Sequence, residues 1–124
     1  MSEASEEQEL TTITQPMVEL PVEDVERAQQ YYGDVLGFKA TWILPDKGMG
    51  AVARGEAGMF FRKTQPPVTP VNLWIFTPQL VATYDEFQRL GANIVEPLEK
   101  KPWGLTQFTV ADIDGHRLIF HHDL

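Results

Sequence analysis

Hydrophobic and polar positions follow two periods along the chain, and the changes of period separate predicted strands from predicted helices. After a polar opening, Thr11–Val22 is rich in β-branched and apolar residues and predicts a strand, with Pro21 marking an edge or an end. Apolar residues then recur three and four positions apart between Asp24, the expected N-cap, and Gly37, which predicts a helix. The expected buried face of that helix consists of Val25, Ala28, Tyr32, Val35 and Leu36.

Short apolar segments separated by turn sequences complete the first half of the chain. They span Phe38–Leu44, Gly50–Arg54 and Met59–Lys63, and the pattern predicts an antiparallel meander. The next segment, Thr64–Val71, holds three prolines and is expected to be a stiff connector. The predicted order up to this point is therefore β-α-β-β-β.

The second half of the chain repeats this order. Asn72–Phe76 predicts a strand, and a helix is expected to follow, with Thr77 as its N-cap, Pro78 in its first position and Gly91 at its end. The residues that keep helical spacing along it are Leu80, Val81, Tyr84 and Phe87. The remaining predicted strands are Asn93–Glu96, Leu105–Ala111 and Arg117–His121, with an Asp114–Gly115 hairpin turn before the last one.

The repeat is also visible residue by residue. An offset of 54 positions lays Leu36-Gly37-Phe38 over Leu90-Gly91-Ala92, and Leu20 over Trp74. We therefore expect an α+β fold of two tandem βαβββ modules, about residues 11–64 and 71–124, that bury each other's apolar faces. Residues 1–10 are expected to form a disordered acidic tail.

Composition narrows the classes of function. The chain has 124 residues, of which 43% are hydrophobic, as in one globular domain, and it holds no membrane-length apolar run or secretion signal, so we expect a cytoplasmic protein without membrane association. No cysteine is present, so any metal would need His, Asp or Glu. The net charge is −8, and −4 without the four glutamates of the tail, which argues against nucleic-acid binding and suits a cationic small molecule better.

The serine, histidine and aspartate side chains give little evidence for a catalytic or metal site. The only serines, Ser2 and Ser5, lie in the tail, which excludes a serine nucleophile from the fold. His121 and His122 are neighbours in a predicted strand and point to opposite faces, so they are interpreted as a polar strand end rather than a joint metal site. His116 is expected to be solvated in its turn. The nearby Asp112 and Asp114 are expected to form local hydrogen bonds in the same turn.

Two stretches carry a resemblance to a known superfamily. They are LPVEDVERAQQYYGDVLGF (Leu20–Phe38) and PWGLTQFTVADIDGHRLIF (Pro102–Phe120). Both resemble the signature stretches of the vicinal oxygen chelate superfamily, which includes glyoxalases, bleomycin resistance proteins and extradiol dioxygenases, and the similarity is greatest to the bleomycin-resistance branch. The resemblance implies that the two modules form a cup-shaped mixed sheet with the helices packed outside, usually in a homodimer. Enzymes and pure binding proteins share this scaffold, so the fold alone does not give the chemistry.

The metal positions of the superfamily distinguish its members. Enzymatic members hold a divalent ion in the cup, and the resemblance places the usual ligand positions on Met17, Asn72 and Ile119. A thioether, one amide and an aliphatic side chain cannot supply the oxygen and nitrogen donors that such an ion needs. We therefore expect no metal and no cofactor, which disfavours glyoxalase or dioxygenase chemistry.

The same positions predict a ligand-binding face. Side chains two apart in a strand share a face, so Glu19 and Pro21 should accompany Met17, and Trp74 and Phe76 should accompany Asn72. For Trp42, a place on this face and packing under a helix are equally favoured. The expected ligand-binding residues are Met17, Glu19, Trp42, Asn72, Trp74, Phe76, Trp103, Gln107 and Thr109. Aromatic rings beside a carboxylate suit a flat or cationic ligand.

Three functional hypotheses follow. The first is a metal-independent binding protein for a bulky aromatic or cationic molecule, such as a glycopeptide antibiotic, with a role in antibiotic resistance. The second is an enzyme of the glyoxalase and dioxygenase type, either a lyase or isomerase that uses protein groups alone or a metal enzyme with displaced ligands, with Glu19 as its best general base. The third is an interaction module whose cup is closed by side chains.

Overall fold

The computed structural model describes residues 10–123, which form two successive modules. The first module contains β1 (Val18–Val22), α2 (Val25–Leu36), β2 (Lys39–Leu44), the 3₁₀ turn η1 (Pro45–Lys47), β3 (Met49–Arg54) and β4 (Ala57–Lys63). The second contains β5 (Asn72–Phe76), α3 (Leu80–Leu90), β6 (Asn93–Lys100), β7 (Thr106–Ala111) and β8 (Arg117–His122). Apart from Leu10, the predicted acidic tail lies outside the described residues.

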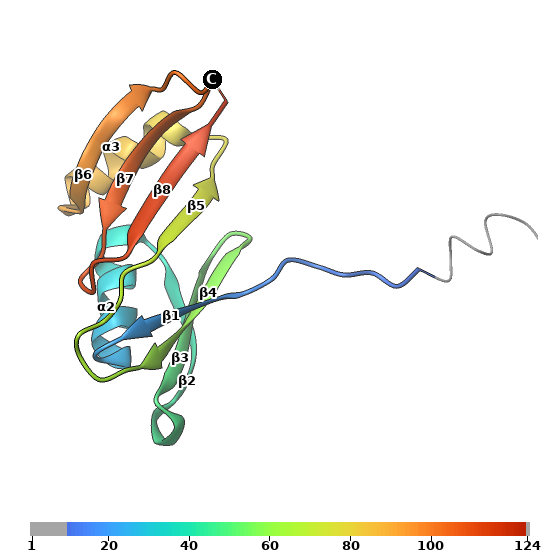
Figure 1. Cartoon of the computed structure of the whole chain (residues 1–124), viewed down its shortest axis with the longest axis vertical. Coiled ribbons are helices and arrows are strands. Elements are labelled where there is room, and N and C mark those ends of the chain that lie inside the picture. The colour runs from blue at the N-terminus through green and yellow to red at the C-terminus, as the bar shows by residue number, and fades with distance from the viewer. Residues whose placement is uncertain (1–9, 124) are drawn as a thin grey trace, which may run out of the picture.

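Each module forms its own four-stranded sheet (Figure 1). The strand orders are β1-β4-β3-β2 and β5-β8-β7-β6, so the two topologies are the same. In each sheet the first strand pairs in parallel with the last, and the other pairs are antiparallel. The predicted α+β fold of two tandem βαβββ modules is therefore confirmed.

The helix ends show where the local predictions succeed and fail. Asp24 caps α2, because its Oδ1 accepts a hydrogen bond of 3.0 Å from the backbone N–H of Arg27, and α2 ends at Gly37 with φ at 71°. The predicted start of α3 at Pro78 is wrong. Thr77 Oγ1 accepts a hydrogen bond from Gln79 N–H in a turn that precedes the helix, and Gln79 is the N-cap. Val81 lies in α3, as its spacing predicted, and its side chain is exposed.

The observed strand bounds differ from the predicted ones mainly where the extent of pairing with a neighbouring strand determines where a strand begins or ends. The predicted strand from Thr11 is only five residues long, Val18–Val22, since β4 pairs with that part alone. β6 continues four residues beyond its predicted end, and β7 begins at Thr106 rather than Leu105. The repeat offset of 54 matches the bounds of β1 and β5, but the buried side chains Leu20 and Leu73 are offset by 53. A shift of one residue exchanges the two faces of a strand, so Leu20 and Trp74 are not equivalent.

One hydrophobic core extends through both modules. Tyr32 of α2 packs against Phe38 and Phe61 in the first module. In the second, Phe108 stacks on Phe120, with ring centroids 5.2 Å apart. The helices lie on one side of the two sheets and contact each other, so the opposite sheet faces remain open.

The turn between β7 and β8 fastens the second module to the first. His116 is fully buried there, so its predicted solvation is wrong. Its Nδ1 accepts a hydrogen bond of 3.0 Å from the backbone N–H of Val71, which leaves Nε2–H to donate to the carbonyl of Pro21 at 2.7 Å. A neutral imidazole therefore joins β1, the connector and β8. Figure 1 shows this turn reaching α2.

Two aspartates of the same turn strengthen the junction. Asp112 Oδ1 accepts hydrogen bonds of 2.9 Å from the backbone N–H groups of Asp114 and His116, as the turn prediction expected. Its Oδ2 also accepts a hydrogen bond of 2.6 Å from the Tyr32 hydroxyl. Burial, followed by the charge of Asp112, raises the pKa of Tyr32 well above its usual value, so the hydroxyl keeps its proton. Asp114 Oδ1 accepts a further bond from the N–H of Glu23.

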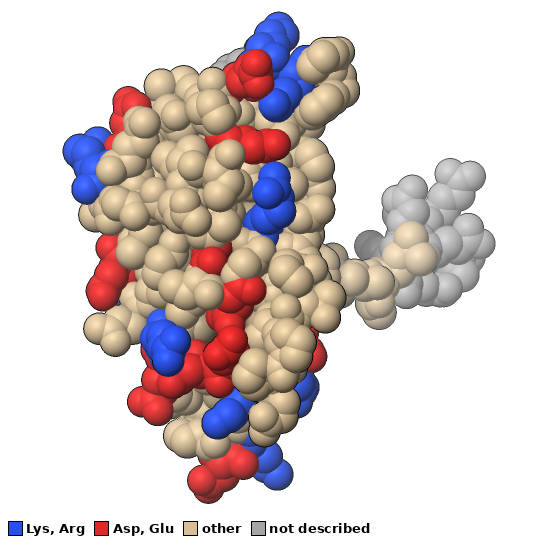
Figure 2. All heavy atoms as spheres, turned by 60° about the vertical axis from the view of Figure 1, so that its left-hand side comes forward, with Lys and Arg blue, Asp and Glu red and all other residues tan. Residues whose placement is uncertain are grey.

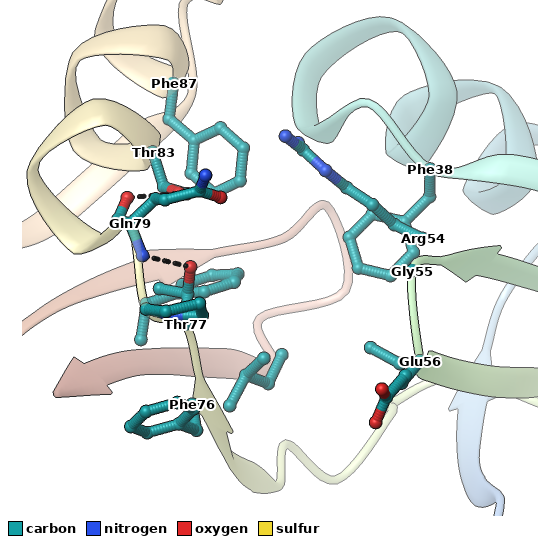
Figure 3. Close-up of a pocket in the computed structure, with 13 residues that line it drawn as sticks. Phe38, Arg54, Gly55, Glu56, Phe76, Thr77, Gln79, Thr83 and Phe87 are labelled. Carbon is teal, nitrogen blue, oxygen red and sulfur yellow. Dashed lines mark hydrogen bonds between the residues drawn. The ribbon is translucent and has the colours of Figure 1, made fainter.

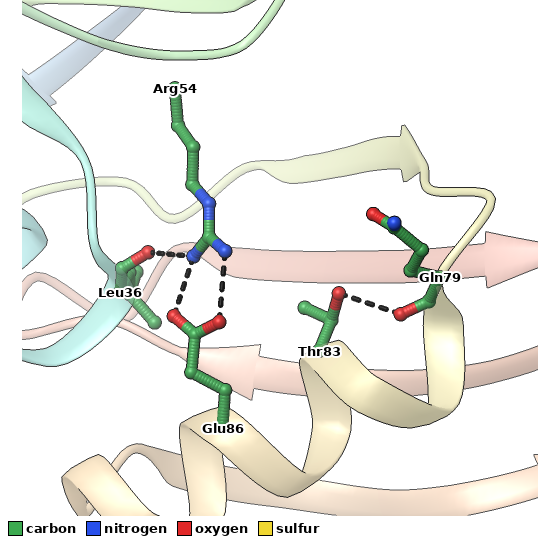
Figure 4. A network of polar contacts seen from close by, with 5 residues as sticks. All are labelled: Leu36, Arg54, Gln79, Thr83 and Glu86. Carbon is green, nitrogen blue, oxygen red and sulfur yellow. Dashed lines mark hydrogen bonds and ion pairs between the residues drawn. The ribbon is translucent and has the colours of Figure 1, made fainter.

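Arg54 at the end of β3 makes a second junction (Figure 4). Its guanidinium donates two hydrogen bonds, of 2.8 and 2.9 Å, to the carboxylate of Glu86 in α3, and one of 2.8 Å to the carbonyl of Leu36. The hydrogen bond from Arg54 lowers the pKa of Glu86. The C-terminal end of α2 is thus connected to α3 through a single side chain.

Acidic and basic side chains are interspersed over the face drawn in Figure 2. Acidic groups gather over its lower half, where the first module lies, with isolated basic groups among them. Neither helix in the described part of the chain is long and apolar enough to cross a membrane.

The Tyr32–Asp112 bond gives a test of the junction. We expect Tyr32→Phe to lower the free energy of unfolding by about 1.5 to 3 kcal/mol, because a buried carboxylate oxygen loses its partner. Tyr31→Phe is the control, since its hydroxyl is half-buried and lies 3.4 Å from the carbonyl of Ala111. We expect this control to cost less than about 1 kcal/mol in urea unfolding. Equal losses in the two variants would contradict a special role for Asp112.

Candidate functional site

The open face of the second sheet carries most of the predicted ligand-binding residues. Trp74 and Phe76 on β5 are 54% and 56% exposed, whereas Leu73 is buried and Ile75 is partly buried. The predicted alternation of faces in this strand is therefore confirmed. Such large exposed aromatic side chains on one sheet face are typical of an interaction site.

A row of side chains crosses this face in register. Gln107 on β7 pairs with His121 on β8, which pairs with Phe76 on β5. Trp103, in the loop before β7, is 62% exposed and donates from its indole Nε1–H to Gln107 Oε1 at 2.9 Å. The Lys101 ammonium lies 5.8 Å from the centroid of that indole. Two contacts therefore orient Trp103 over the buried Gln107.

A second row lies beside the first. Thr109 on β7 pairs with Ile119 on β8, which pairs with Trp74. Thr109 is buried and its hydroxyl donates to Glu96 Oε1 at 3.1 Å. The other oxygen of Glu96 lies 3.6 Å from Arg117, which pairs in register with the exposed Asn72. The predicted residues Gln107 and Thr109 thus lie beneath the aromatic rings and already have partners within the chain.

The remaining predicted residues lie on the first sheet. Glu19 on β1 forms an ion pair with Arg62 on β4, with Oε2 and Nε 3.0 Å apart, so the carboxylate has a partner that the sequence did not indicate. Trp42 on β2 lies against Phe60 at a centroid distance of 6.2 Å, on the face that Phe60 shares with Glu19. Trp42 therefore does not pack under α2. Met17 is half-exposed and directly precedes β1.

The structure thus divides the predicted residues between two separate sheets. Glu19 and Trp42 belong to the first sheet and Met17 directly precedes it, and the others belong to the second sheet or to the loop that enters it. No hydrogen bond or ring contact among the described residues joins the two groups.

A cavity of about 530 Å³ lies at the junction of the modules (Figure 3). Phe38, Arg54 and Glu56 line one wall, and Thr77 and Phe87 line the other. Its lining includes the buried rings of Phe38, Phe87 and Phe120, and of the predicted ligand-binding residues it includes Phe76. The open sheet faces, rather than this cavity, hold the predicted site.

Sequence reasoning missed His121. Its ring lies edge-on to Trp74 and to Phe76, with centroids 5.8 and 5.9 Å apart, on the open face of β8. Burial, followed by the neighbouring His122, lowers the pKa of His121, so its ring is neutral near pH 7. The alternation rule could have found it, because His121 is two residues beyond Ile119, which the resemblance placed on the ligand side.

The residues present do not fit a divalent metal ion. At the positions that the resemblance assigns to the metal ligands, Met17 is half-exposed, Asn72 is exposed and Ile119 is buried. These side chains offer one amide oxygen as a hard donor. Within residues 10–123, no group of three or more His, Asp or Glu side chains is placed to hold a metal ion.

Comparisons with known proteins agree with this architecture. TioX from Micromonospora sp. ML1 is 28% identical, with a TM-score of 0.77 over 90% of this chain and 100% of that chain. A bleomycin-binding protein complexed with bleomycin is 21% identical, with a TM-score of 0.78 over 90% of this chain and 100% of its own. A bleomycin resistance determinant encoded on the transposon Tn5 is 22% identical, with a TM-score of 0.77 over 90% of this chain and 98% of that chain. At these identities the two bleomycin proteins show a shared fold.

No curated protein matches the sequence. The family that matches is described as the Glyoxalase/Bleomycin resistance protein/Dioxygenase superfamily, and the match covers residues 14–120. This range includes both βαβββ modules and the open sheet faces. The chain therefore belongs to the Glyoxalase/Bleomycin resistance protein/Dioxygenase superfamily.

Proposed function

We propose that the protein binds a bulky, partly aromatic small molecule on the open face of the second sheet and does not transform it. The observation that carries this proposal is the group of exposed rings, Trp74, Phe76 and Trp103, over the buried polar side chains of Gln107 and Thr109. Rings of this kind supply large contact areas and stacking surfaces to a ligand. Their exposed surface contributes no burial of apolar area to the stability of the fold.

The charge of the protein favours a cationic ligand. A net charge of −8 attracts cations at long range, and exposed tryptophan faces also bind them. A glycopeptide antibiotic of the bleomycin type combines a flat aromatic group with a positive charge. The bleomycin-binding relative supports this ligand class, because its fold matches over nearly the whole chain.

Binding without turnover follows from the groups that are absent from the expected catalytic positions. Glu19, the candidate general base, is held in an ion pair by Arg62, so its carboxylate already has a partner within the chain. The donor set at the metal positions does not fit a divalent ion. The candidate base of the enzymatic hypothesis therefore already has a partner, and a divalent ion has no suitable set of ligands at the positions assigned to it.

A homodimer would bring the two open faces together. The predicted residues lie on two sheets that do not meet within one chain, and a cup needs two walls. We infer that the first sheet of one copy faces the second sheet of the other, with the ligand between them. The cytoplasm is the proposed location, in keeping with a role in antibiotic sequestration.

Binding of metal-free bleomycin tests the ligand class and the independence of metal together. We expect purified protein with less than about 0.1 equivalents of Zn, Ni, Fe or Mn by elemental analysis to bind it with a Kd in the micromolar range or tighter, about −8 kcal/mol. Binding should survive prior treatment with a chelator. Stoichiometric metal, or binding that the chelator abolishes, would contradict the metal-free proposal.

Trp74→Ala tests the face itself. We expect this change to weaken bleomycin binding by about 1 to 3 kcal/mol, as for other aromatic anchors, with little loss of folding stability. Leu73→Ala is the matched control on the opposite face of the same strand, and it should cost about 2 to 5 kcal/mol of stability while affinity is retained. Calorimetry and urea unfolding measure the two effects. The reverse assignment of losses would show that the aromatic face is not the site.

Light scattering tests the assembly. We expect a mass of two copies of the 14.1 kDa chain. A mixture of Trp42→Ala and Trp74→Ala proteins, unfolded and refolded together, should recover part of the binding, because each mixed dimer contains one cup with both tryptophans. A monomer that binds with full affinity would contradict the shared cup.

A further inference from the structure

His121 is a polar group in the centre of the aromatic face that no internal bond explains. Its Nδ1 is buried and has no hydrogen-bond partner among the described residues; Nδ1 of His122, on the opposite face, is also buried without a hydrogen bond but lies 3.1 Å from the carboxylate of Asp123. Buried ring nitrogens in folded proteins are nearly always paired, so an unpaired one calls for an explanation. A structural role, as His116 has with its two bonds, does not account for it.

The surroundings of His121 are arranged around its ring. Trp74 and Phe76 meet the imidazole edge-on from β5, and Gln107 lies beside it on β7 with its Oε1 already occupied by Trp103. A half-turn about the Cβ–Cγ bond exchanges Nδ1 with Cδ2. The ring can therefore present a nitrogen to the open face without moving the backbone.

Few charged or titratable groups lie near His121. The side chains that adjoin it on β5 and β7 carry no charge: Trp74 and Phe76 contact its ring, and Gln107 pairs with it in register. On β8 itself the neighbour is His122, whose Nδ1 lies 3.1 Å from Asp123. One strand further, Glu99 pairs in register with Gln107 and is bound to Lys101 at 2.8 Å. No carboxylate among these stabilises a charged His121.

We propose that His121 is the specificity-determining group of the aromatic face. Its neutral imidazole donates a hydrogen bond to, or accepts one from, a polar group at the edge of a flat aromatic ligand. This inference rests on the proposed function and adds the ligand's polar edge to it. A ligand stacked between Trp74 and Phe76 covers the imidazole and removes it from water. Covering it disfavours the imidazolium, so a ligand binds the neutral form and affinity falls as the pH drops through the pKa of His121.

The test measures metal-free bleomycin binding by calorimetry at about pH 7.5 and about pH 5, with wild type and three variants. We expect wild type to bind more weakly at the lower pH, by at most about tenfold for each pH unit below the pKa of His121, because one proton competes with the ligand. His121→Phe keeps the ring and removes the hydrogen bond, so it should bind about tenfold more weakly at the higher pH. His121→Gln keeps a neutral hydrogen-bonding group and should bind within about threefold of wild type at the higher pH. The ionisation of bleomycin itself is common to all proteins, so differences between them report on the protein.

His122→Gln is the comparison variant: it removes the neighbouring imidazole, which lies on the other face of β8 but contacts Phe76 at a centroid distance of 4.9 Å and helps to lower the pKa of His121. We expect it to keep the extra pH dependence of wild type, displaced to higher pH because the pKa of His121 rises, whereas both His121 variants lose it. Loss of that dependence in His122→Gln, or wild-type affinity with an unchanged pH profile in His121→Phe, would overturn the inference and leave the proposed function standing. Failure of wild type to bind bleomycin at either pH would overturn the proposed ligand class, and this inference with it. Circular dichroism of each variant confirms that a loss of binding is not a loss of fold.

Discussion

The hydrogen bonds of the turn Asp112–His116 hold the two modules in one arrangement, and the rest of the structure depends on them. From this turn His116 reaches Pro21, Asp114 reaches Glu23 and Asp112 reaches Tyr32. Each bond crosses from the second module to the first; the Tyr32–Asp112 bond is buried and the His116–Pro21 bond is part-buried. Because a buried polar group without a partner costs about 1 to 3 kcal/mol, displacing the turn would leave several such penalties at once.

This junction fixes which surfaces are covered. With the turn seated against β1 and α2, both helices pack into one shared core, and Arg54 connects their ends through Glu86. The opposite faces of both sheets stay open. On the second sheet this face holds exposed rings over buried polar groups, so the junction that stabilises the fold also leaves the proposed ligand surface available.

Much of the fold was predictable because it depends on local signals. The helix caps at Asp24 and Gly37 and the alternation in Asn72–Phe76 need only neighbours in sequence, and both were predicted correctly. The burial of His116 was not predictable, since its partners Val71 and Pro21 are 45 and 95 residues away. The strand expected from Thr11 failed for a related reason. A β-rich sequence forms a strand only where another strand pairs with it, and β4 ends that pairing at Val18.

Sequence spacing predicted which face of a strand carries the candidate site residues, but not which sheet each residue lies on or what it contacts. Alternation placed Glu19 and Trp74 on open faces, yet it could not show that these faces belong to two sheets, or that Arg62 neutralises Glu19. It also left out His121, whose significance comes from contacts with Trp74 and Phe76 on another strand. Such cross-strand contacts depend on register, which sequence spacing alone does not give.

The central claim is that ligand binds the open aromatic face of the second sheet. Its most direct test is a nitrogen-15 NMR titration with metal-free bleomycin, followed at the indole N–H signals of the three tryptophans. The indoles of Trp74 and Trp103 are predicted to shift together and to saturate at a single ligand concentration. Saturable binding that leaves both signals unchanged, and instead moves the backbone signals of Arg54, Thr77 and Thr83 around the junction cavity, would contradict the claim.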